Sequence, residues 1–228
     1  MPKQPRAGGG MKVLLAVAAA APILVLVAVI GARTGAWSAS FGFETLTMIV
    51  ARYLALAGVA AAALSVVLAL KDMKRRWVFA AAAVVLAGAT LAGFLMQQGR
   101  FDQAAPIDVS TDVTETPSFS RLVQDERRKA GAVVSPGAKA CAAAVPSQMA
   151  PEAATAALEA AGFTVVGSAP FRAEGFRKGF WFGFTHDAVI RIRPGQTDVR
   201  VTAREGVAQG DVACRMATAI VAELQARR

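Results

Sequence analysis

Arginine side chains gather on one predicted β-hairpin of this chain, close to residue 200. Residues 188–193 and 198–204 both alternate apolar and polar side chains with period two, and turn-forming residues 194–197 lie between them. Alternate residues of a strand share a face. The polar face of the hairpin therefore carries four arginines: Arg191, Arg193, Arg200 and Arg204. Guanidinium groups bind carboxylates and phosphates through paired hydrogen bonds, so this face predicts an anion site.

The expected register of the hairpin bears on the partner of these arginines. A two-residue turn at Gly195 and Gln196 would place Arg191 directly opposite Arg200, and like charges opposed across a sheet are destabilising unless an anion lies between them. Three carboxylates are candidates for an internal partner: Glu174, Asp187 and Asp198. An external anion, such as a lipid headgroup, a phosphate or an acidic ligand, is the alternative.

An aromatic run precedes the hairpin. Residues 180–184 alternate so that three phenylalanines would face the core from a strand, whereas Trp181 would face away from it. An exposed tryptophan would sit at the level of lipid headgroups or line a ligand groove. Our candidate binding residues are therefore Arg191, Arg200, Arg204, Asp187, Asp211 and Trp181.

Motifs for catalysis or cofactor binding are not recognisable in the chain. Nucleophile-elbow, phosphate-loop and dinucleotide patterns are absent, and His186 is the only histidine, with no second ligand at metal-binding spacing. We therefore predict no cofactor, no metal and no catalytic residue. An enzyme acting on an envelope substrate is kept as an alternative, with three aspartates beside the arginines as its polar site: Asp108, Asp112 and Asp187.

Cys141 and Cys214 are the only two cysteines. A disulfide between them would close a long loop and would require an oxidising compartment. Two buried free thiols are the other interpretation, because neither cysteine belongs to a spacing signature. If the bond forms, the two Cα atoms must lie within about 7 Å of each other.

The elements that would position these residues form an α+β domain. A proline start, an acidic first turn and a glycine stop predict a helix over 151–161, and Asp211 is placed to cap a second helix over 211–226. Strands are predicted at 163–166 and in the hairpin, residues 171–176 and 180–184 are predicted to form either one further strand or a broken pair of strands, and 130–151 is predicted to be irregular. We expect an antiparallel sheet of about four strands backed by two helices.

Three apolar stretches fill the first hundred residues: 13–32, 46–70 and 78–96. Each has about the 20 residues that a helix needs to cross a hydrocarbon core of about 30 Å. We predict three transmembrane helices in residues 1–100, followed by a soluble domain in residues 101–228. A cleaved signal peptide is the competing interpretation of the first stretch, but its length and the two helices after it favour a retained anchor.

The net charge of +9 belongs to the membrane region. Residues 1–100 carry ten Lys and Arg against two acidic residues, which gives +8, and residues 101–228 carry fifteen against fourteen, which gives +1. The soluble domain therefore has no basic footprint for nucleic acid. Seven cations lie before the first helix and between the second and third, but only Arg33 and Arg100 lie on the other side. The positive-inside rule then predicts a cytoplasmic N-terminus and a periplasmic C-terminal domain in the bacterial inner membrane.

Three sequence motifs of the soluble domain follow one known pattern. They are Pro106 to Asp112 with Pro117 and Phe119, then Phe182-Gly183-Phe184 with Asp187, Val189 and Arg191, then Asp198-Val199-Arg200 with Arg204, Gly206 and Asp211. Residues 105–226 thereby resemble the uncharacterised bacterial family catalogued as domain of unknown function 1499. Members with N-terminal membrane helices share this architecture. The pattern departs at Cys214 and Arg215, where it has an apolar residue and an asparagine. The resemblance implies a domain boundary and no reaction.

The sequence thus favours an integral inner-membrane protein of unknown biochemical activity. Its partners would be the lipid bilayer and, on the outer side, an anionic ligand, an envelope component or a partner protein. A scaffold for membrane-protein assembly is a further alternative beside the enzyme. An arginine face neutralised wholly by internal carboxylates would favour the scaffold.

Overall fold

The structure is a computed structural model that describes residues 9–101, 106–207 and 209–228. The chain falls into two compact units, Met1–Gly99 and Arg100–Arg228. The first is here called the membrane unit. The second is called the C-terminal domain. Each has its own set of buried side chains, so the two are described separately.

The membrane unit consists of long apolar helices. Helix α1 (Gly9–Thr34) is followed by a π-helical segment, η1 (Phe41–Ala51), which continues into α2 (Arg52–Leu70), and then by α3 (Met73–Phe101). Three of the described helical stretches are long and apolar enough to cross a membrane: Gly9–Thr34, Phe41–Leu70 and Arg76–Gln97. The three predicted membrane helices are therefore confirmed as helices of suitable length and composition. The second begins at Phe41, before the predicted start, because η1 extends it.

Small side chains line the contacts between these helices. Ala18, Ala62, Ala83 and Ala87 form one buried cluster contributed by α1, α2 and α3. A Cβ added to Gly58 would lie 3.3 Å from the Cα of Ala18, so α1 and α2 approach closely at this point. Without a hydrophobic driving force between helices in lipid, such close packing is a main source of their association.

The C-terminal domain is built on a mixed sheet of six strands in the order β2-β1-β6-β5-β4-β3. The strands are β1 (Asp108–Ser110), β2 (Lys139–Ala140), β3 (Thr164–Ala169), β4 (Arg172–Lys178), β5 (Thr185–Arg193) and β6 (Gln196–Ala203). The prediction of an antiparallel sheet of about four strands was therefore wrong in the number of strands and in the type of sheet. The difference lies in β1 and β2, which have three and two residues, pair in parallel and extend the sheet beyond β6.

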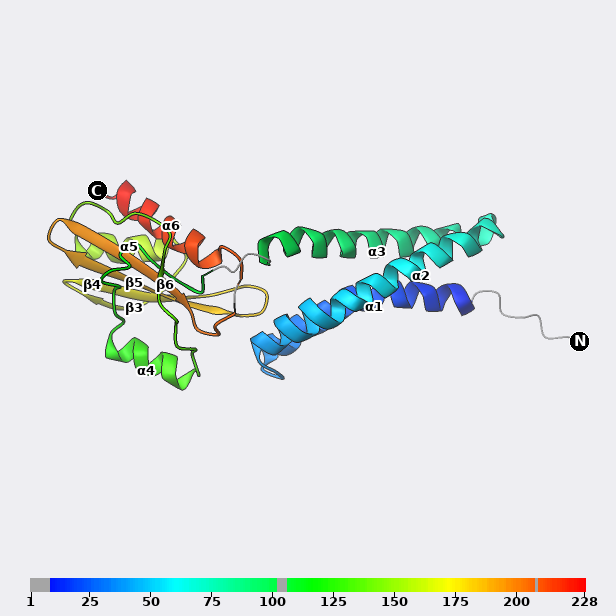
Figure 1. The fold of residues 1–228 in the computed structure, drawn as a ribbon, viewed down its shortest axis with the longest axis horizontal. Helices are drawn as coiled ribbons and strands as arrows, with labels where there is room; N and C mark the ends of the chain where they lie inside the picture. The colour runs from blue at the N-terminus through cyan, green and yellow to red at the C-terminus, as the bar shows by residue number, and fades with distance from the viewer. Residues whose placement is uncertain (1–8, 102–105, 208) are drawn as a thin grey trace, which may run out of the picture. The chain divides into compact units, whose positions relative to one another are not determined.

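Helices cover both faces of this sheet (Figure 1). Helices α5 (Pro151–Ala160) and α6 (Val212–Ala226) pack on one face and enclose the main core, which includes Leu158, Ile190 and Ile220. A third helix, α4 (Arg121–Lys129), lies on the other face, where Val123 and Phe119 pack against Val189 of β5. The sequence predicted α5 and α6 but not α4, so the expected two-helix domain has three helices.

The hairpin forms, but its register differs from the predicted one. The turn is at Pro194 and Gly195, so Arg191 lies opposite Asp198 and Arg200 lies opposite Val189. Gly195 has φ +75°, and proline followed by a glycine of positive φ suits the central positions of a tight turn. The shift is two residues, which preserves the faces, so Ile190 and Val199 still share the core side.

Residues 179–184 form a loop, so residues 180–184 neither continue the strand at 171–176 nor form a second strand, which contradicts both predicted alternatives. Phe180 is 79% exposed and Trp181 is 63% exposed, whereas Phe184 is buried. The glycines at 179 and 183 bracket this loop, and Gly183 has φ +75°, a conformation that strand residues do not adopt. Of the three phenylalanines assigned to the core, Phe180 is exposed, Phe182 is half-buried and Phe184 is buried.

Cys141 and Cys214 form a disulfide, with their Cα atoms 5.6 Å apart. This distance is within the limit stated from the sequence, and the free-thiol interpretation is wrong. The bond joins the segment that follows β2 to the first turn of α6. It therefore ties a short edge strand and its loop to the main core.

Candidate functional site

The arginines of the hairpin bind carboxylates of the C-terminal domain itself. At the turn end, Arg191 and Arg193 both contact Asp112 and Asp198, with N–O distances of 2.8 to 3.1 Å. The Asp198 side chain is fully buried. Arg193 also contacts Glu115 at 2.6 Å. Asp198 was among the expected partners, but the pairing with Asp112 and Glu115 joins residues about eighty positions apart in the sequence.

Two further ion pairs continue along the same face. Arg200 donates from Nε and Nη2 to the two oxygens of Asp108, at 3.0 and 2.7 Å. Arg204 contacts Asp187 at 2.6 Å, and the same carboxylate accepts a 2.6 Å hydrogen bond from Arg127 of α4. Asp108 and Asp187 are both buried. The hydrogen bond to Asp187 raises the pKa of Arg204, so this guanidinium stays charged at any physiological pH.

These arginines fasten a segment of the chain to the sheet. Arg200 donates to the carbonyl oxygen of Pro117, and the ring of Phe119 lies 5.2 Å from the Arg200 guanidinium and 5.4 Å from that of Arg127. The Ser120 N–H donates to Glu174 at 2.6 Å. Among the described residues, the ion pairs of Arg191 and Arg200 do not include Glu174. The arginine face therefore holds residues 112–129, including α4, in place.

The three aspartates of the alternative enzyme site all take part in these pairs. Hydrogen bonds from the Glu115 N–H and the Thr114 hydroxyl hold the pKa of the Asp112 carboxyl far below its usual value. Asp108 and Asp187 are bound by arginines, as described above. The Asp112 carboxyl, with its pKa held this low, is a poor proton donor.

Trp181 and Asp211 lie apart from the ion pairs. Trp181 stacks edge-to-face on Phe180 in the exposed loop between β4 and β5, with ring centroids 5.4 Å apart. Asp211 precedes α6, but its side chain makes no capping hydrogen bond and pairs instead with Arg215 one turn along. Asp211 occupies the predicted cap position, but the expected capping hydrogen bond is absent because Arg215, four residues later, binds the Asp211 carboxylate.

His186 is buried on the core side of β5. Burial lowers its pKa to about 4, an effect that the charge of Asp187 partly opposes. Its Nδ1 has no hydrogen-bond partner among the described residues. The imidazole is thus neutral at pH 7. Within the described part of the chain, no group of three or more His, Cys, Asp or Glu side chains is arranged to hold a metal ion.

Arg172 is the arginine that sequence reasoning missed. It lies on β4 directly opposite Arg191 and on the same face of the sheet. It is half-buried, and among the described residues no carboxylate forms an ion pair with it. The signal was present in the sequence, because pairing 171–176 antiparallel with the hairpin places Arg172 beside the other arginines. Arg172 was not among the predicted site residues because no pairing register was predicted for the strand at 171–176.

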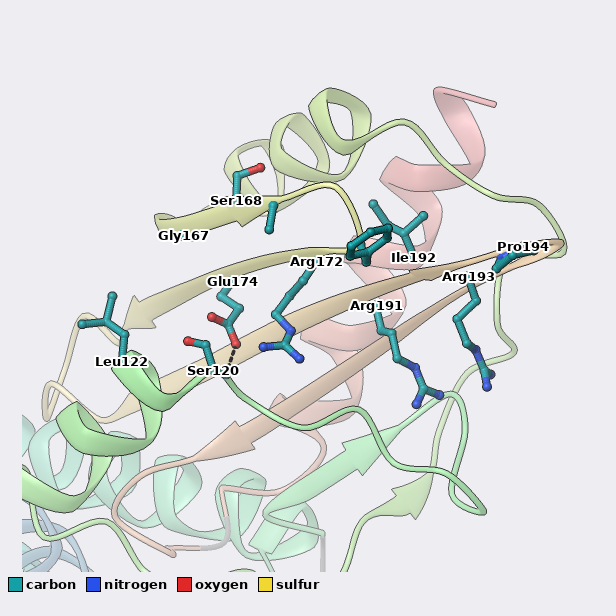
Figure 2. A pocket seen from close by; sticks show the side chains of 12 residues that line it. Ser120, Leu122, Gly167, Ser168, Arg172, Glu174, Arg191, Ile192, Arg193 and Pro194 are labelled. Carbon is teal, nitrogen blue, oxygen red and sulfur yellow. Dashed lines mark hydrogen bonds between the residues drawn. The ribbon is translucent and has the colours of Figure 1, made fainter.

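Arg172 is one of the residues that line a pocket of about 680 Å³. Figure 2 shows Arg172, Arg191 and Arg193 on adjacent strands with their guanidinium groups on the same side of the sheet. Glu174 and Ser120 lie at one end of this row, joined by their hydrogen bond. Apolar side chains complete the lining: Leu122, Ala169, Phe171, Ile192 and Pro194. In the described part of the chain, Arg172 is thus a cation of the pocket that has no ion-pair partner, and apolar side chains line the same pocket.

No family model, no curated protein and no solved structure matches the chain. The resemblance of residues 105–226 to domain of unknown function 1499 therefore stays a prediction, carried by its three motifs. The site must accordingly be interpreted from its own geometry.

Proposed function

We propose that this chain is an integral protein of the bacterial inner membrane whose C-terminal domain lies in the periplasm and binds an anionic ligand beside Arg172. The site proposed from the sequence thus moves from the hairpin arginines to their neighbour on β4. Envelope components that carry a carboxylate or phosphate fall within this ligand class.

The unpaired guanidinium of Arg172 is the observation that carries the proposal. A half-buried cation has lost part of its hydration and regains that energy when an anion binds it. Arg172 also lies opposite Arg191, and like charges at such positions repel each other. Arg191 is already neutralised by Asp112 and Asp198, so Arg172 is the group on this face that an added anion would satisfy.

The lining of the pocket restricts the ligand further. Two of the lining side chains, Phe171 and Leu122, are 72% and 60% exposed, although apolar side chains of this size are usually buried. A volume of about 680 Å³ is typical of sites for small molecules. We therefore propose a ligand with an anionic group for Arg172 and an apolar group for Phe171 and Leu122.

The hairpin arginines taken alone would favour the scaffold alternative. Arg191, Arg193, Arg200 and Arg204 all have internal carboxylate partners. A domain that only supports membrane-protein assembly would need nothing more. A scaffold role gives no reason for Arg172 to line a pocket without an ion-pair partner among the described residues. The ligand-binding proposal is therefore preferred.

Removing the Arg172 charge is expected to weaken anion binding in the pocket. We expect the full chain, in lipid nanodiscs, to bind phenyl phosphate more tightly than inorganic phosphate, because the phenyl ring contacts the apolar wall. Arg172→Gln should weaken phenyl phosphate binding by roughly 10- to 100-fold, as expected for one charged hydrogen-bonding group. Isothermal titration calorimetry measures both probes on both proteins.

Lys178→Gln is the matched control for this experiment. It removes one positive charge from the same strand but at its far end, away from the pocket residues. Its affinity for phenyl phosphate should equal that of the unsubstituted chain. Equal binding by the Arg172→Gln protein, or equal affinities for the two probes, would contradict the proposed site.

The orientation in the membrane rests on the charge distribution and on the disulfide. Seven cations flank the predicted cytoplasmic side, against Arg33 and Arg100 on the other. The bond between Cys141 and Cys214 is of the kind that persists in oxidising compartments such as the periplasm. Both observations support a periplasmic C-terminal domain.

Reporter fusions test this orientation directly. A fluorescent protein that matures only in the cytoplasm should be dark when fused after Arg228, because translocation prevents its folding. The same reporter inserted after Asp72, in the basic loop between α2 and α3, should be bright. A bright fusion after Arg228 would reverse the topology and remove the periplasm from the proposal.

A further inference from the structure

An exposed aromatic pair lies at one end of the sheet. The loop from Gly179 to Phe184 joins the end of β4 to the start of β5 and presents Phe180 and Trp181 to solvent. Lys178, the last residue of β4, is also exposed and has no ion-pair partner among the described residues. Aromatic rings beside a cation suit the headgroup region of a bilayer, which accepts rings that are apolar in body and polar at the edge.

The chain enters the C-terminal domain at this same end. The N–H of Ala203 donates to the carbonyl oxygen of Ile107, and Ala203 is paired with His186, which is paired with Arg177. Ile107 therefore lies at the sheet end that carries the loop. Helix α4 also ends here, since Arg127 contacts Asp187.

A second exposed apolar segment lies nearby. The N–H of Val133 donates to the carbonyl oxygen of Arg204, whose own N–H donates to Thr185 at the start of β5. Val133 is 48% exposed and Val134 is 89% exposed. This sheet end therefore carries two apolar segments that are exposed in the described part of the domain, Phe180 with Trp181 and Val133 with Val134. The opposite end of β4 carries the Arg172 pocket.

The length of chain before Ile107 places this end within reach of the membrane surface. The third candidate membrane span ends at Gln97, and Pro106 is the first described residue after the gap. Eight residues lie between them, and even a fully extended chain of that length reaches only roughly 30 Å. The bilayer is thus an available occupant for the exposed apolar segments, and its anionic lipids complement Lys178.

We infer that Phe180 and Trp181, supported by Lys178 and Val134, form a membrane-docking tip that inserts into the lipid headgroup region. The docked tip holds the entry end of the sheet against the bilayer and turns the Arg172 pocket toward the periplasm. The occupant is lipid, and the inference does not depend on what the pocket binds.

Depth-dependent fluorescence quenching in the full chain tests this inference. The chain has three tryptophans, and the changes Trp37→Phe and Trp77→Phe leave Trp181 as the sole emitter. The protein is placed in nanodiscs of phosphatidylethanolamine and phosphatidylglycerol with lipids brominated close to the headgroup. Trp181 should emit at shorter wavelength than a solvated tryptophan and lose most of its intensity to the brominated lipids. Adding Lys178→Glu should reduce that quenching.

The matched control moves the tryptophan to the other end of β4. The changes Phe171→Trp and Trp181→Phe, in the same background, place the emitter at a position that is 72% exposed. This tryptophan should be quenched by aqueous iodide and not by the brominated lipids. If Trp181 behaves like the control, or both emitters are quenched equally by lipid, the docking tip is wrong. If Trp181 is shielded from both quenchers, a protein contact covers it and the lipid occupant is wrong.

Discussion

Arg200→Ala is expected to lower the free energy of unfolding of the C-terminal domain by about 3 to 5 kcal/mol. Asp108, whose side chain is fully buried, accepts hydrogen bonds on both oxygens from Arg200. Removing the guanidinium leaves a buried carboxylate without its counter-charge, and the segment at Pro117 loses its hydrogen bond to the same group. Urea titration followed by pulse proteolysis of the full chain in detergent measures the loss.

Two controls separate this effect from a general loss of charge. Arg128→Ala removes an arginine of which 79% of the side chain is exposed, and should cost at most about 1 kcal/mol because exposed ion pairs contribute little. The double change Asp108→Leu with Arg200→Met replaces the whole pair by apolar side chains and should recover most of the stability. A loss below about 1 kcal/mol for Arg200→Ala would mean that the Asp108 carboxylate is solvated.

The same substitution separates the two partners considered for the arginine face. If an external anion neutralised Arg200, its removal would relieve repulsion and leave the domain as stable as before. A large loss of unfolding free energy is expected because Arg200 is paired with the internal carboxylate of Asp108. Arg172, which has no carboxylate partner among the described residues, is therefore the arginine of this sheet face that is proposed to bind a ligand.

Periodic patterns were sufficient to predict the central elements of the domain. The hairpin, β4, α5 and α6 each bury a face or stripe at a spacing that can be read from the chain, and β3 contributes the partly buried Val165 to the same core. The shorter elements have no such signal. β1 and β2 are stabilised by neighbouring strands, and α4 is almost wholly polar, with Val123 as its buried residue.

The ion pairs of the site could not be predicted for a related reason. Arg200 and Asp108 are 92 positions apart, and Arg193 and Asp112 are 81 apart, so no local spacing connects them. The hairpin register was wrong because the turn forms at Pro194 and Gly195, one position before the predicted turn at Gly195 and Gln196. The faces were nevertheless correct, since a slip of two residues keeps each side chain on its own side.

Loss of the disulfide is expected to have an effect as large as that of Arg200→Ala. Cys141 and Cys214 are separated by 73 positions, and closing a loop of that length restricts the unfolded chain by about 4 kcal/mol in the chain-entropy model. Changing both cysteines to serine should lower the free energy of unfolding by about that amount. The urea titration described for Arg200→Ala measures this in the full chain.

Reduction of the unsubstituted protein is the matched control, because it breaks the same bond without changing a side chain. Dithiothreitol should reproduce the loss in the unsubstituted chain and have no effect on the double serine variant. In intact cells, the thiols should resist alkylation until a reductant is added, since the periplasm is oxidising. Alkylation without reductant would place the domain in a reducing compartment, whatever its stability, and would contradict the periplasmic orientation. Equal unfolding of the oxidised chain and the double variant would instead show that the bond closes a loop already ordered in the unfolded ensemble.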